Sequence, residues 1–125
     1  MLAKDIMTKH VVTVTPETTI NDAIKLLVEN EISGLIVVNP DKDVIGVISE
    51  KDLMVAFDWL GVTKATIRDY YNKAIVSVSE DTPIEEINRL LVLKNIKRVP
   101  VLRGTKLAGV VSRRDILKFI FEKNL

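Results

Sequence analysis

The chain contains no cysteine and only one histidine in its 125 residues. The lack of cysteine excludes a disulfide framework and metal sites built from thiolates. No apolar run approaches the roughly 20 residues that cross a membrane, and the first ten residues have no apolar core of the kind found in a signal peptide. We therefore expect a soluble, cytoplasmic protein that holds no metal ion.

An excess of charge of one sign is missing as well. Eighteen Lys and Arg residues against 17 Asp and Glu residues give a formal net charge of +1. Nothing global therefore favours nucleic acid or an anionic membrane as a partner. His10 stands alone, and no serine or lysine has an evident activating base at a recognisable spacing. The sequence thus predicts neither an enzyme nor a bound cofactor.

What the chain does contain is an internal repeat. The stretch 46–52, Gly-Val-Ile-Ser-Glu-Lys-Asp, returns 63 residues later as Gly-Val-Val-Ser-Arg-Arg-Asp at 109–115. In each case an apolar run typical of a strand precedes the stretch and an amphipathic run follows it. The fold is therefore expected to consist of two similar copies.

Both copies have the same order of predicted elements. Strands are predicted at residues 11–14, 35–38 and 44–48 in the first copy and at 75–78, 99–102 and 107–111 in the second. Helices are predicted to follow N-caps at Thr18, Ser49, Thr82 and Ser112. Each copy thus reads strand, helix, strand, strand, helix, an α/β (α+β) fold. Since one such copy has little apolar area, we expect the two to share a core about a pseudo-twofold axis.

The repeated Ser-x-x-Asp pattern has two interpretations. It is a capping box, in which the serine oxygen accepts from an amide of the first turn and the carboxylate accepts from the serine amide. It is also suited to a ligand, because a helix N-terminus offers free amides to a phosphate while the aspartate accepts from sugar hydroxyls. The glycine three residues before each serine allows another backbone or a flat ring to approach closely. The sequence leaves both interpretations open.

Element order and residues together resemble a tandem pair of CBS domains, the regulatory module named after cystathionine β-synthase. The resemblance rests on residues 5–8, 11–14, 32–38, 46–52, 82–83, 96–101 and 109–115. It divides the chain into a first CBS repeat at 1–60, a linker at 61–66 and a second repeat at 67–125. It implies two clefts between the repeats, each able to hold an adenosine nucleotide such as AMP, ADP or ATP, or a related adenosyl ligand.

The resemblance also implies which residues line each cleft. The first cleft would combine Ser49 and Asp52 with Ile75, Val76, Val99 and Pro100. The second would combine Ser112 and Asp115 with Val11, Val12, Ser33, Gly34 and Leu35. In each, the aspartate would hold the ribose hydroxyls, the serine would lie near the phosphate, and the base would lie against the opposite repeat.

Basic residues distinguish the two clefts. Lys97 and Arg98 occupy the places of Ser33 and Gly34, so the Asp52 cleft should prefer the more highly phosphorylated ligand. The alternative is that they are solvated residues at a helix C-terminus, where positive charge is favourable. Arg114, with its neighbour Arg113, would add positive potential to the Asp115 cleft only by pointing inward.

The predicted closing helices are apolar on more than one side. The surplus consists of Leu53, Met54, Phe57, Trp59, Leu60, Phe119, Ile120 and Phe121. It indicates a homodimer surface, with burial in the core as the alternative. We therefore expect a stand-alone regulatory module that binds adenosine nucleotides and signals to an effector protein. The rival interpretation is a ligand-free scaffold for protein interaction, and a nucleic-acid binder is disfavoured by the near-neutral charge.

Overall fold

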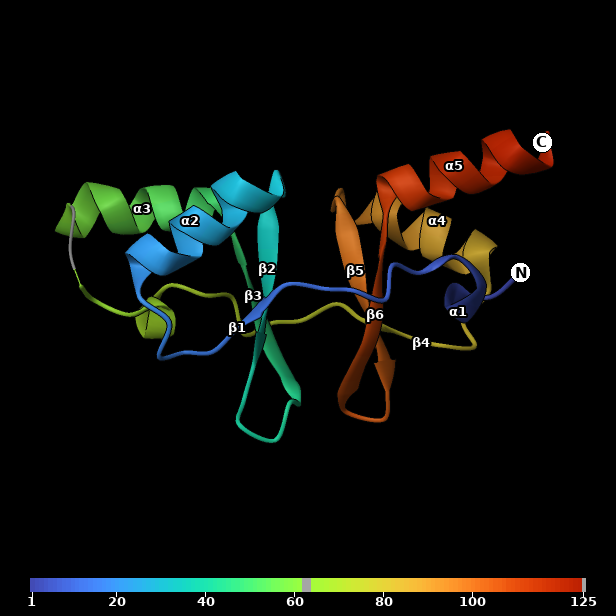
Figure 1. Ribbon diagram of the computed structural model, residues 1–125. Helices are drawn as coiled ribbons and strands as arrows, with labels where there is room; N and C mark the ends of the chain where they lie inside the picture. Colours follow the sequence, from blue (N-terminus) through green and yellow to red (C-terminus); the bar gives the residue numbers. More distant parts are fainter. Residues whose placement is uncertain (62–63, 125) are drawn as a thin grey trace. The chain divides into compact units, whose positions relative to one another are not determined.

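The computed structural model describes residues 1–61 and 64–124 of the chain (Figure 1). The elements of the first half are α1 (Ala3–Ile6), β1 (Thr13–Val14), α2 (Ile20–Asn30), β2 (Gly34–Val38), β3 (Val44–Ser49) and α3 (Glu50–Leu60). Those of the second half are the 3-10 helix η1 (Ile67–Asp69), β4 (Val78–Ser79), α4 (Ile84–Leu93), β5 (Arg98–Arg103), β6 (Lys106–Ser112) and α5 (Arg113–Lys123). The predicted order of strand, helix, strand, strand, helix is confirmed in both repeats.

Each repeat forms its own three-stranded sheet. The strand orders are β1-β2-β3 and β4-β5-β6, with a parallel outer pair followed by an antiparallel hairpin. Val78 of β4 pairs with Val101 just as Val14 of β1 pairs with Val37. The first strand of each sheet has only two residues, so the four-residue strands predicted at 11–14 and 75–78 were too long.

Two predicted helix starts are wrong by one residue. The N-cap of α2 is Thr19, whose side chain accepts from the Asp22 amide. The hydroxyl of the predicted cap, Thr18, instead accepts from the Thr15 amide in the preceding turn. The N-cap of α4 is Pro83, because the Thr82 hydroxyl is turned back to accept from the Ser79 amide at 3.0 Å. The capping boxes predicted at Ser49 and Ser112 are both present.

The chain folds into two compact units that do not coincide with the sequence repeats. Unit 1 consists of Met1–Val11 with Val76–Leu125, and unit 2 consists of Val12–Ile75. Each unit has a hydrophobic core of its own, which corrects the expectation of one shared core. Ala3, from the first repeat, is buried in the core of unit 1, and Ile67, from the second, is buried in the core of unit 2. Each repeat therefore completes its core with the lead-in segment of the other.

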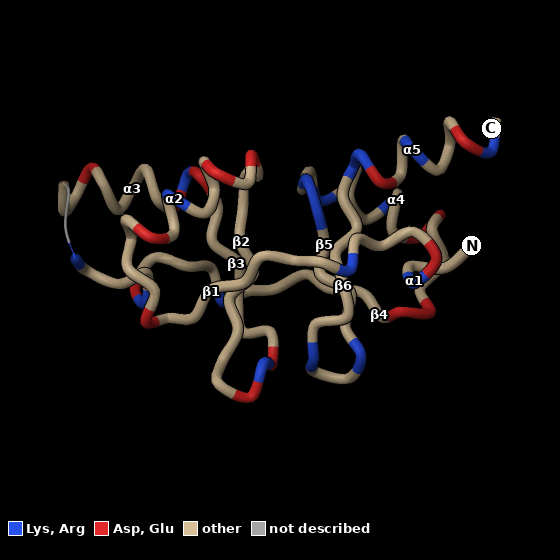
Figure 2. Tube along the Cα trace, in the orientation of Figure 1, with Lys and Arg blue, Asp and Glu red and all other residues tan. Residues whose placement is uncertain are grey.

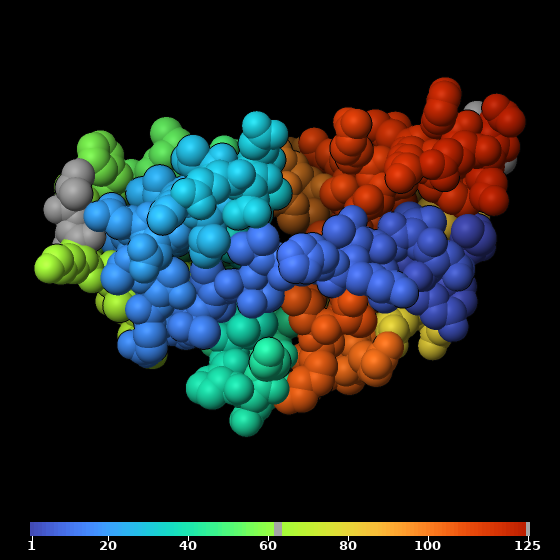
Figure 3. All heavy atoms as spheres, viewed as in Figure 1, coloured from blue at the N-terminus to red at the C-terminus, as the bar shows by residue number. Residues whose placement is uncertain are grey.

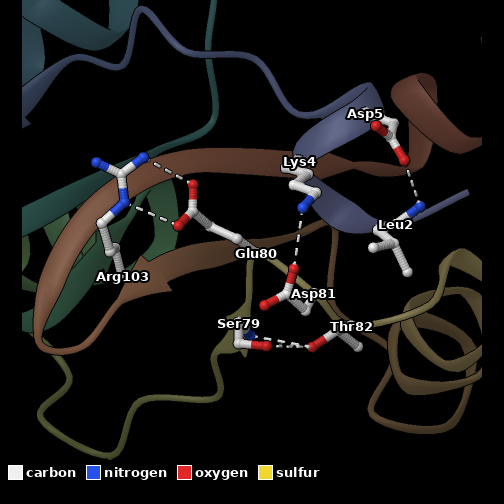
Figure 4. A network of polar contacts seen from close by, with 8 residues as sticks. All are labelled: Leu2, Lys4, Asp5, Ser79, Glu80, Asp81, Thr82 and Arg103. Atoms are coloured by element: carbon white, nitrogen blue, oxygen red, sulfur yellow. Dashed lines mark hydrogen bonds and ion pairs between the residues drawn. The ribbon is translucent and has the colours of Figure 1, made fainter.

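The N-terminal segment is fixed to the second repeat by backbone and side-chain contacts (Figures 3 and 4). The Ala3 amide donates to the Thr82 carbonyl at 2.8 Å, and the Lys4 amide donates to the Glu80 carbonyl at 3.0 Å. An ion pair joins the Lys4 ammonium to Asp81 at 3.2 Å, though both side chains are exposed and its energy is small. In unit 2, η1 occupies the corresponding place, with the Ile67 amide donating to the Thr18 carbonyl.

The predicted linker, residues 61–66, is described only in part, because residues 62 and 63 lie outside the described residues. Among the helices of residues 1–61 and 64–124, none combines the length and the apolar character needed to cross a membrane.

Candidate functional site

The candidate site of unit 2 lies where β3 ends and α3 begins. The Asp52 amide donates to Ser49 Oγ at 3.2 Å, and the Ser49 amide donates to Asp52 Oδ2 at 2.8 Å. The Ser49 hydroxyl and the Asp52 carboxylate are thus both held at the positive end of an 11-residue helix. This arrangement fixes the orientation of the carboxylate and brings a hydroxyl beside it.

Unit 1 repeats this geometry where β6 ends and α5 begins. The Ser112 amide and hydroxyl both donate to Asp115 Oδ2, at 2.8 and 2.9 Å. The second carboxylate oxygen, Oδ1, accepts a hydrogen bond of 3.3 Å from the Thr8 hydroxyl. Because Thr8 belongs to the first repeat, the N-terminal lead-in takes part in the candidate site of the second.

The start of the central hairpin lies beside each capped aspartate. In unit 2, Gly34 pairs with Ser49, and the Glu50 amide donates to the Ser33 carbonyl at 3.1 Å. In unit 1, Arg98 pairs with Ser112, and the Arg113 amide donates to the Lys97 carbonyl at 3.0 Å. Within one unit, therefore, Ser33 and Gly34 neighbour Asp52, whereas Lys97 and Arg98 neighbour Asp115.

The glycines of the repeated stretch have a structural explanation. A Cβ added to Gly46 would lie 2.4 Å from Tyr71 Cδ2 and 2.5 Å from the Asn72 carbonyl oxygen. At Gly109 it would lie 2.7 Å from Met7 Sδ and 2.8 Å from the Thr8 carbonyl oxygen. The predicted close approach of a backbone is therefore confirmed, and the group that approaches is the lead-in segment of the other repeat.

The two lead-ins pack in the same way despite their different sequences. Thr8 and Val110 exchange two backbone hydrogen bonds of 2.8 and 3.0 Å, and Asn72 and Val47 exchange two of the same lengths. Tyr71 packs against the core of unit 2. Thr8 and Asn72 were not among the predicted site residues. Their equivalence at an offset of 64 residues was visible in the sequence, but its consequence was not.

The remaining predicted site residues differ in exposure. Leu35 is 1% exposed and Val99 0%, and both side chains belong to the cores. Pro100 is also buried. These three could therefore meet a ligand only through their backbone. The half-buried members of the predicted set are Val11, Val12, Ile75 and Val76, and Arg114 is exposed.

Two arginines of unit 1 have defined partners. Arg113 Nε donates to the Ile96 carbonyl at 3.0 Å, and its guanidinium also contacts Asn95 Oδ1 at 3.2 Å. Its charge thus lies against the turn that follows α4, where a helix C-terminus favours a cation. Arg103 donates twice to the Glu80 carboxylate, at 2.8 and 2.9 Å (Figure 4). These hydrogen bonds hold the pKa of Glu80 below its ordinary value, against the opposing effect of desolvation.

The fold and the paired capped aspartates define a two-repeat module in which each β-α-β-β-α repeat ends in the same strand-to-helix turn. The family model described as "CBS domain" matches residues 3–58 and 67–122. Because the two matches cover most of the chain, the protein belongs to the CBS-domain family, as a tandem pair.

Solved structures with the same architecture include two with adenosine compounds. The chain is 27% identical to CBSX2, whose crystal structure is in complex with AMP, and the match covers 99% of this chain and 98% of that one with a TM-score of 0.88. It is 26% identical to the CBS domain pair of protein MJ0100, in complex with 5-methylthioadenosine and S-adenosyl-L-methionine, with 98% of both chains covered and a TM-score of 0.86.

Curated relatives contain the same module within longer proteins. The chain is 32% identical over 117 residues to inosine-5'-monophosphate dehydrogenase of Methanocaldococcus jannaschii, covering 93% of this chain and 23% of that protein. It is 39% identical over 120 residues to the zinc metalloprotease MJ0392 of the same organism, covering 93% of this chain and 31% of that protein. The chain thus spans a third or less of these two relatives. The matches to proteins with enzyme names therefore concern only their CBS portions.

Proposed function

We propose that this protein is a regulatory module that binds an adenosine-containing ligand through the capped aspartates Asp52 and Asp115. The observation that carries the proposal is the Ser-x-x-Asp turn present at equivalent places in both repeats, in a chain similar along nearly its whole length to pairs in complex with AMP or adenosyl compounds. Each aspartate would accept from the ribose hydroxyls, and each serine would lie near the phosphate or its equivalent.

The proposed clefts draw on both repeats. At Asp115 of the second repeat, the Thr8 hydroxyl of the first repeat donates to the carboxylate. In unit 2, Asn72 of the second repeat exchanges backbone hydrogen bonds with Val47, two residues before Ser49 of the first. Ligand binding would then favour one arrangement of the repeats, by as much as the ligand's affinities for the available arrangements differ. An effector protein would respond to that change, and the module itself would carry out no catalysis.

Exposed apolar side chains support a homodimer as the working form. On α3, Met54, Phe57 and Trp59 are exposed, Trp59 by 78%, and on α5 Phe121 is 80% exposed. Not all of the predicted surface is available. Leu53 is buried, and Phe119 and Ile120 pack against the core of unit 1. The remaining exposed side chains are a suitable surface for a second copy.

Thermal unfolding with and without ligand tests the binding proposal. AMP, ADP, ATP, S-adenosylmethionine and methylthioadenosine would each be added in large excess to the purified protein. A ligand that binds only the folded state, present at about 100 times its dissociation constant, stabilises that state by about 2.7 kcal/mol. We expect a clear rise in midpoint with at least one compound, and loss of that rise on replacing Asp52 and Asp115 by asparagine.

The chain offers a matched control for these variants. Asp22 lies in a third Thr/Ser-x-x-Asp pattern at a helix start, where the Thr19 hydroxyl accepts from its amide. The close glycine contact that accompanies Asp52 and Asp115 is absent from this pattern, since Pro16 stands three residues before Thr19. Replacing Asp22 by asparagine should leave the ligand-induced shift intact. No shift with any compound, in folded and nucleotide-free protein, would favour the scaffold instead, because the capping boxes are complete without a ligand.

A further inference from the structure

The two capped aspartates differ in how much of their hydrogen-bonding capacity the protein itself uses. An ionised carboxylate offers about four lone-pair positions to donors. At Asp115, the Ser112 amide, the Ser112 hydroxyl and the Thr8 hydroxyl donate at 2.8, 2.9 and 3.3 Å. At Asp52, the Ser49 amide at 2.8 Å is the only donor within the described parts of the chain. Two residues that the repeat makes equivalent are therefore unequal as acceptors.

The lead-in segments cause part of this difference. Thr8 and Asn72 are equivalent at an offset of 64 residues, and the backbone of each exchanges two hydrogen bonds with a strand of the other repeat. The Asn72 side chain, however, accepts from the Ala74 amide at 2.9 Å, a local contact that is typical of asparagine in turns. The Thr8 hydroxyl instead reaches Asp115. Within residues 1–61 and 64–124, only the N-terminal lead-in donates to a capped aspartate.

A ribose with two neighbouring hydroxyls needs two acceptor positions. Asp52 has these positions free, whereas Asp115 has about one left, so a ligand there must replace an existing hydrogen bond. The contact from Thr8 is the longest of the three and therefore the weakest. Because Thr8 is exposed, water can take the place of the carboxylate as the partner of its hydroxyl. Thr8 is thus the donor that a ligand replaces at the lowest cost.

The Thr8 hydroxyl can leave Asp115 while the lead-in stays in place. The Thr8 backbone is held by two hydrogen bonds of 2.8 and 3.0 Å to Val110. Its carbonyl oxygen also packs closely on Gly109, where an added Cβ would lie only 2.8 Å away. Rotation about χ1 moves the hydroxyl to another staggered position without disturbing these backbone contacts. The competition therefore concerns one side chain and not the docking of the segment.

We propose that the Thr8 hydroxyl competes with the ligand for Asp115 and thereby raises the ligand concentration at which this site fills. The inference rests on the proposed function, because it concerns the regulation of the same pair of sites. One exposed hydrogen bond corresponds to a change of about twofold to tenfold in a dissociation constant. The Asp52 site has no such competitor. The module would then respond to its ligand in two steps, at two concentrations.

Charge also differs between the sites, and the choice of probes takes this into account. Basic residues begin β5 and α5 beside Asp115, and Figure 2 shows them in blue. They are Arg98, Arg113 and Arg114, where the Asp52 site has Gly34, Glu50 and Lys51. AMP carries a phosphate that these charges attract, whereas methylthioadenosine has the ribose hydroxyls without a phosphate. Since Thr8 acts on the ribose contact, removing its hydroxyl should change the affinity for both compounds by the same factor.

Single-site variants separate the two affinities. Asp52→Asn leaves the Asp115 site intact, and Asp115→Asn leaves the Asp52 site intact. The dissociation constants of methylthioadenosine and AMP would be measured by isothermal titration calorimetry in each protein, with and without Thr8→Val. This substitution removes the hydroxyl and keeps the branched shape. We expect it to tighten binding about twofold to tenfold in the Asp52→Asn protein and to leave binding unchanged in the Asp115→Asn protein.

Two controls show that the hydroxyl itself is responsible. Thr8→Ser keeps a hydroxyl and should retain the affinity of the Asp52→Asn protein. The Val110 amide should stay equally protected from hydrogen exchange in Thr8→Val, because the lead-in remains docked.

Unchanged or weaker binding on Thr8→Val in the Asp52→Asn protein would overturn the competition, and weaker binding would mean that Thr8 helps to hold the ligand. Equal tightening in both single-site proteins would also overturn it, since the effect would then not act through Asp115. If neither methylthioadenosine nor AMP binds the wild-type protein, the proposed function fails, and this inference fails with it. The measurement on the wild type thus distinguishes the failure of the proposed function from the failure of the competition alone.

Discussion

Replacing Gly46 by alanine should displace the lead-in of the second repeat from β3. The new methyl carbon would lie 2.5 Å from the Asn72 carbonyl oxygen, whereas ordinary van der Waals contact begins at 3.4 Å. The backbone must therefore move by about 0.9 Å. The hydrogen bond from the Val47 amide to that oxygen, now 3.0 Å, would stretch to about 3.9 Å if the movement lies along it, beyond the usual limit of about 3.2 Å.

The expected cost follows from these two effects. Overpacking a close contact costs about 1 to 3 kcal/mol, and each lost backbone hydrogen bond costs about 1 kcal/mol more. We therefore expect Gly46→Ala to lower the free energy of unfolding by about 2 to 4 kcal/mol. Gly109→Ala should cost less, because one of its two close neighbours is the flexible Met7 side chain and the Thr8 carbonyl oxygen lies at 2.8 Å.

Urea unfolding and amide hydrogen exchange together provide the assay. The Val47 and Asn72 amides should lose protection in Gly46→Ala, since each donates to the other residue's carbonyl. The double variant Gly46→Ala/Tyr71→Ala removes the clash with the ring and keeps the clash with the carbonyl. A Gly46→Ala protein within about 0.5 kcal/mol of wild type, with both amides protected, would show that the added methyl group does not displace the lead-in, because such a change is typical of a surface substitution.

Two further predictions concern unit 1. Deleting residues 1–9 should destabilise this unit by at least about 3 kcal/mol in urea unfolding, because it removes Ala3, Ile6 and Met7 from the core. The Val110 amide donates to the Thr8 carbonyl, so the deletion should also make this amide exchange faster with solvent. Unchanged protection of Val110 would contradict the packing of the N-terminal lead-in against the second repeat. Because the pKa of Glu80 is lowered in the folded state, its stabilising contribution is present above the ordinary pKa of the carboxyl and is lost as pH falls through the folded value. Arg103→Gln should therefore reduce the acid-induced loss of stability between neutral and strongly acidic pH, as measured by thermal midpoints, and identical pH profiles would exclude this pair.

Most of the fold could be predicted because its signals are local. The apolar stripe of α2 and the continuous apolar runs of β2 and β5 each fall within a dozen residues, so periodicity identifies them. The errors lie where distant parts of the chain decide. The Thr82 hydroxyl accepts from the Ser79 amide, and the Thr82 carbonyl accepts from the Ala3 amide. Ala3 lies far away in the sequence, so no local pattern contains this second hydrogen bond.

The short first strands have a similar cause. The chain passes from unit 1 to unit 2 between Val11 and Val12, and returns between Ile75 and Val76. Only Thr13 and Val14 reach the register of β2, so the apolar residues before them pair with no strand of their own sheet. Apolar composition predicts burial, but it does not tell which sheet, if any, receives the segment. The exchange of lead-ins is invisible to periodicity for the same reason.

The candidate site shows why a motif cannot by itself separate a cap from a ligand contact. The cap uses Oδ2 of each aspartate, which accepts from the serine amide at 2.8 Å in both units. A ribose hydroxyl would need an acceptor held in one orientation, and the cap provides that orientation by fixing the carboxylate. The two roles therefore require the same residues at the same spacing. What differs is the second carboxylate oxygen, because Oδ1 of Asp115 already accepts from the Thr8 hydroxyl. A ligand at Asp115 must therefore share or displace this hydrogen bond. Only the folded chain reveals it, since Thr8 and Asp115 lie far apart in the sequence.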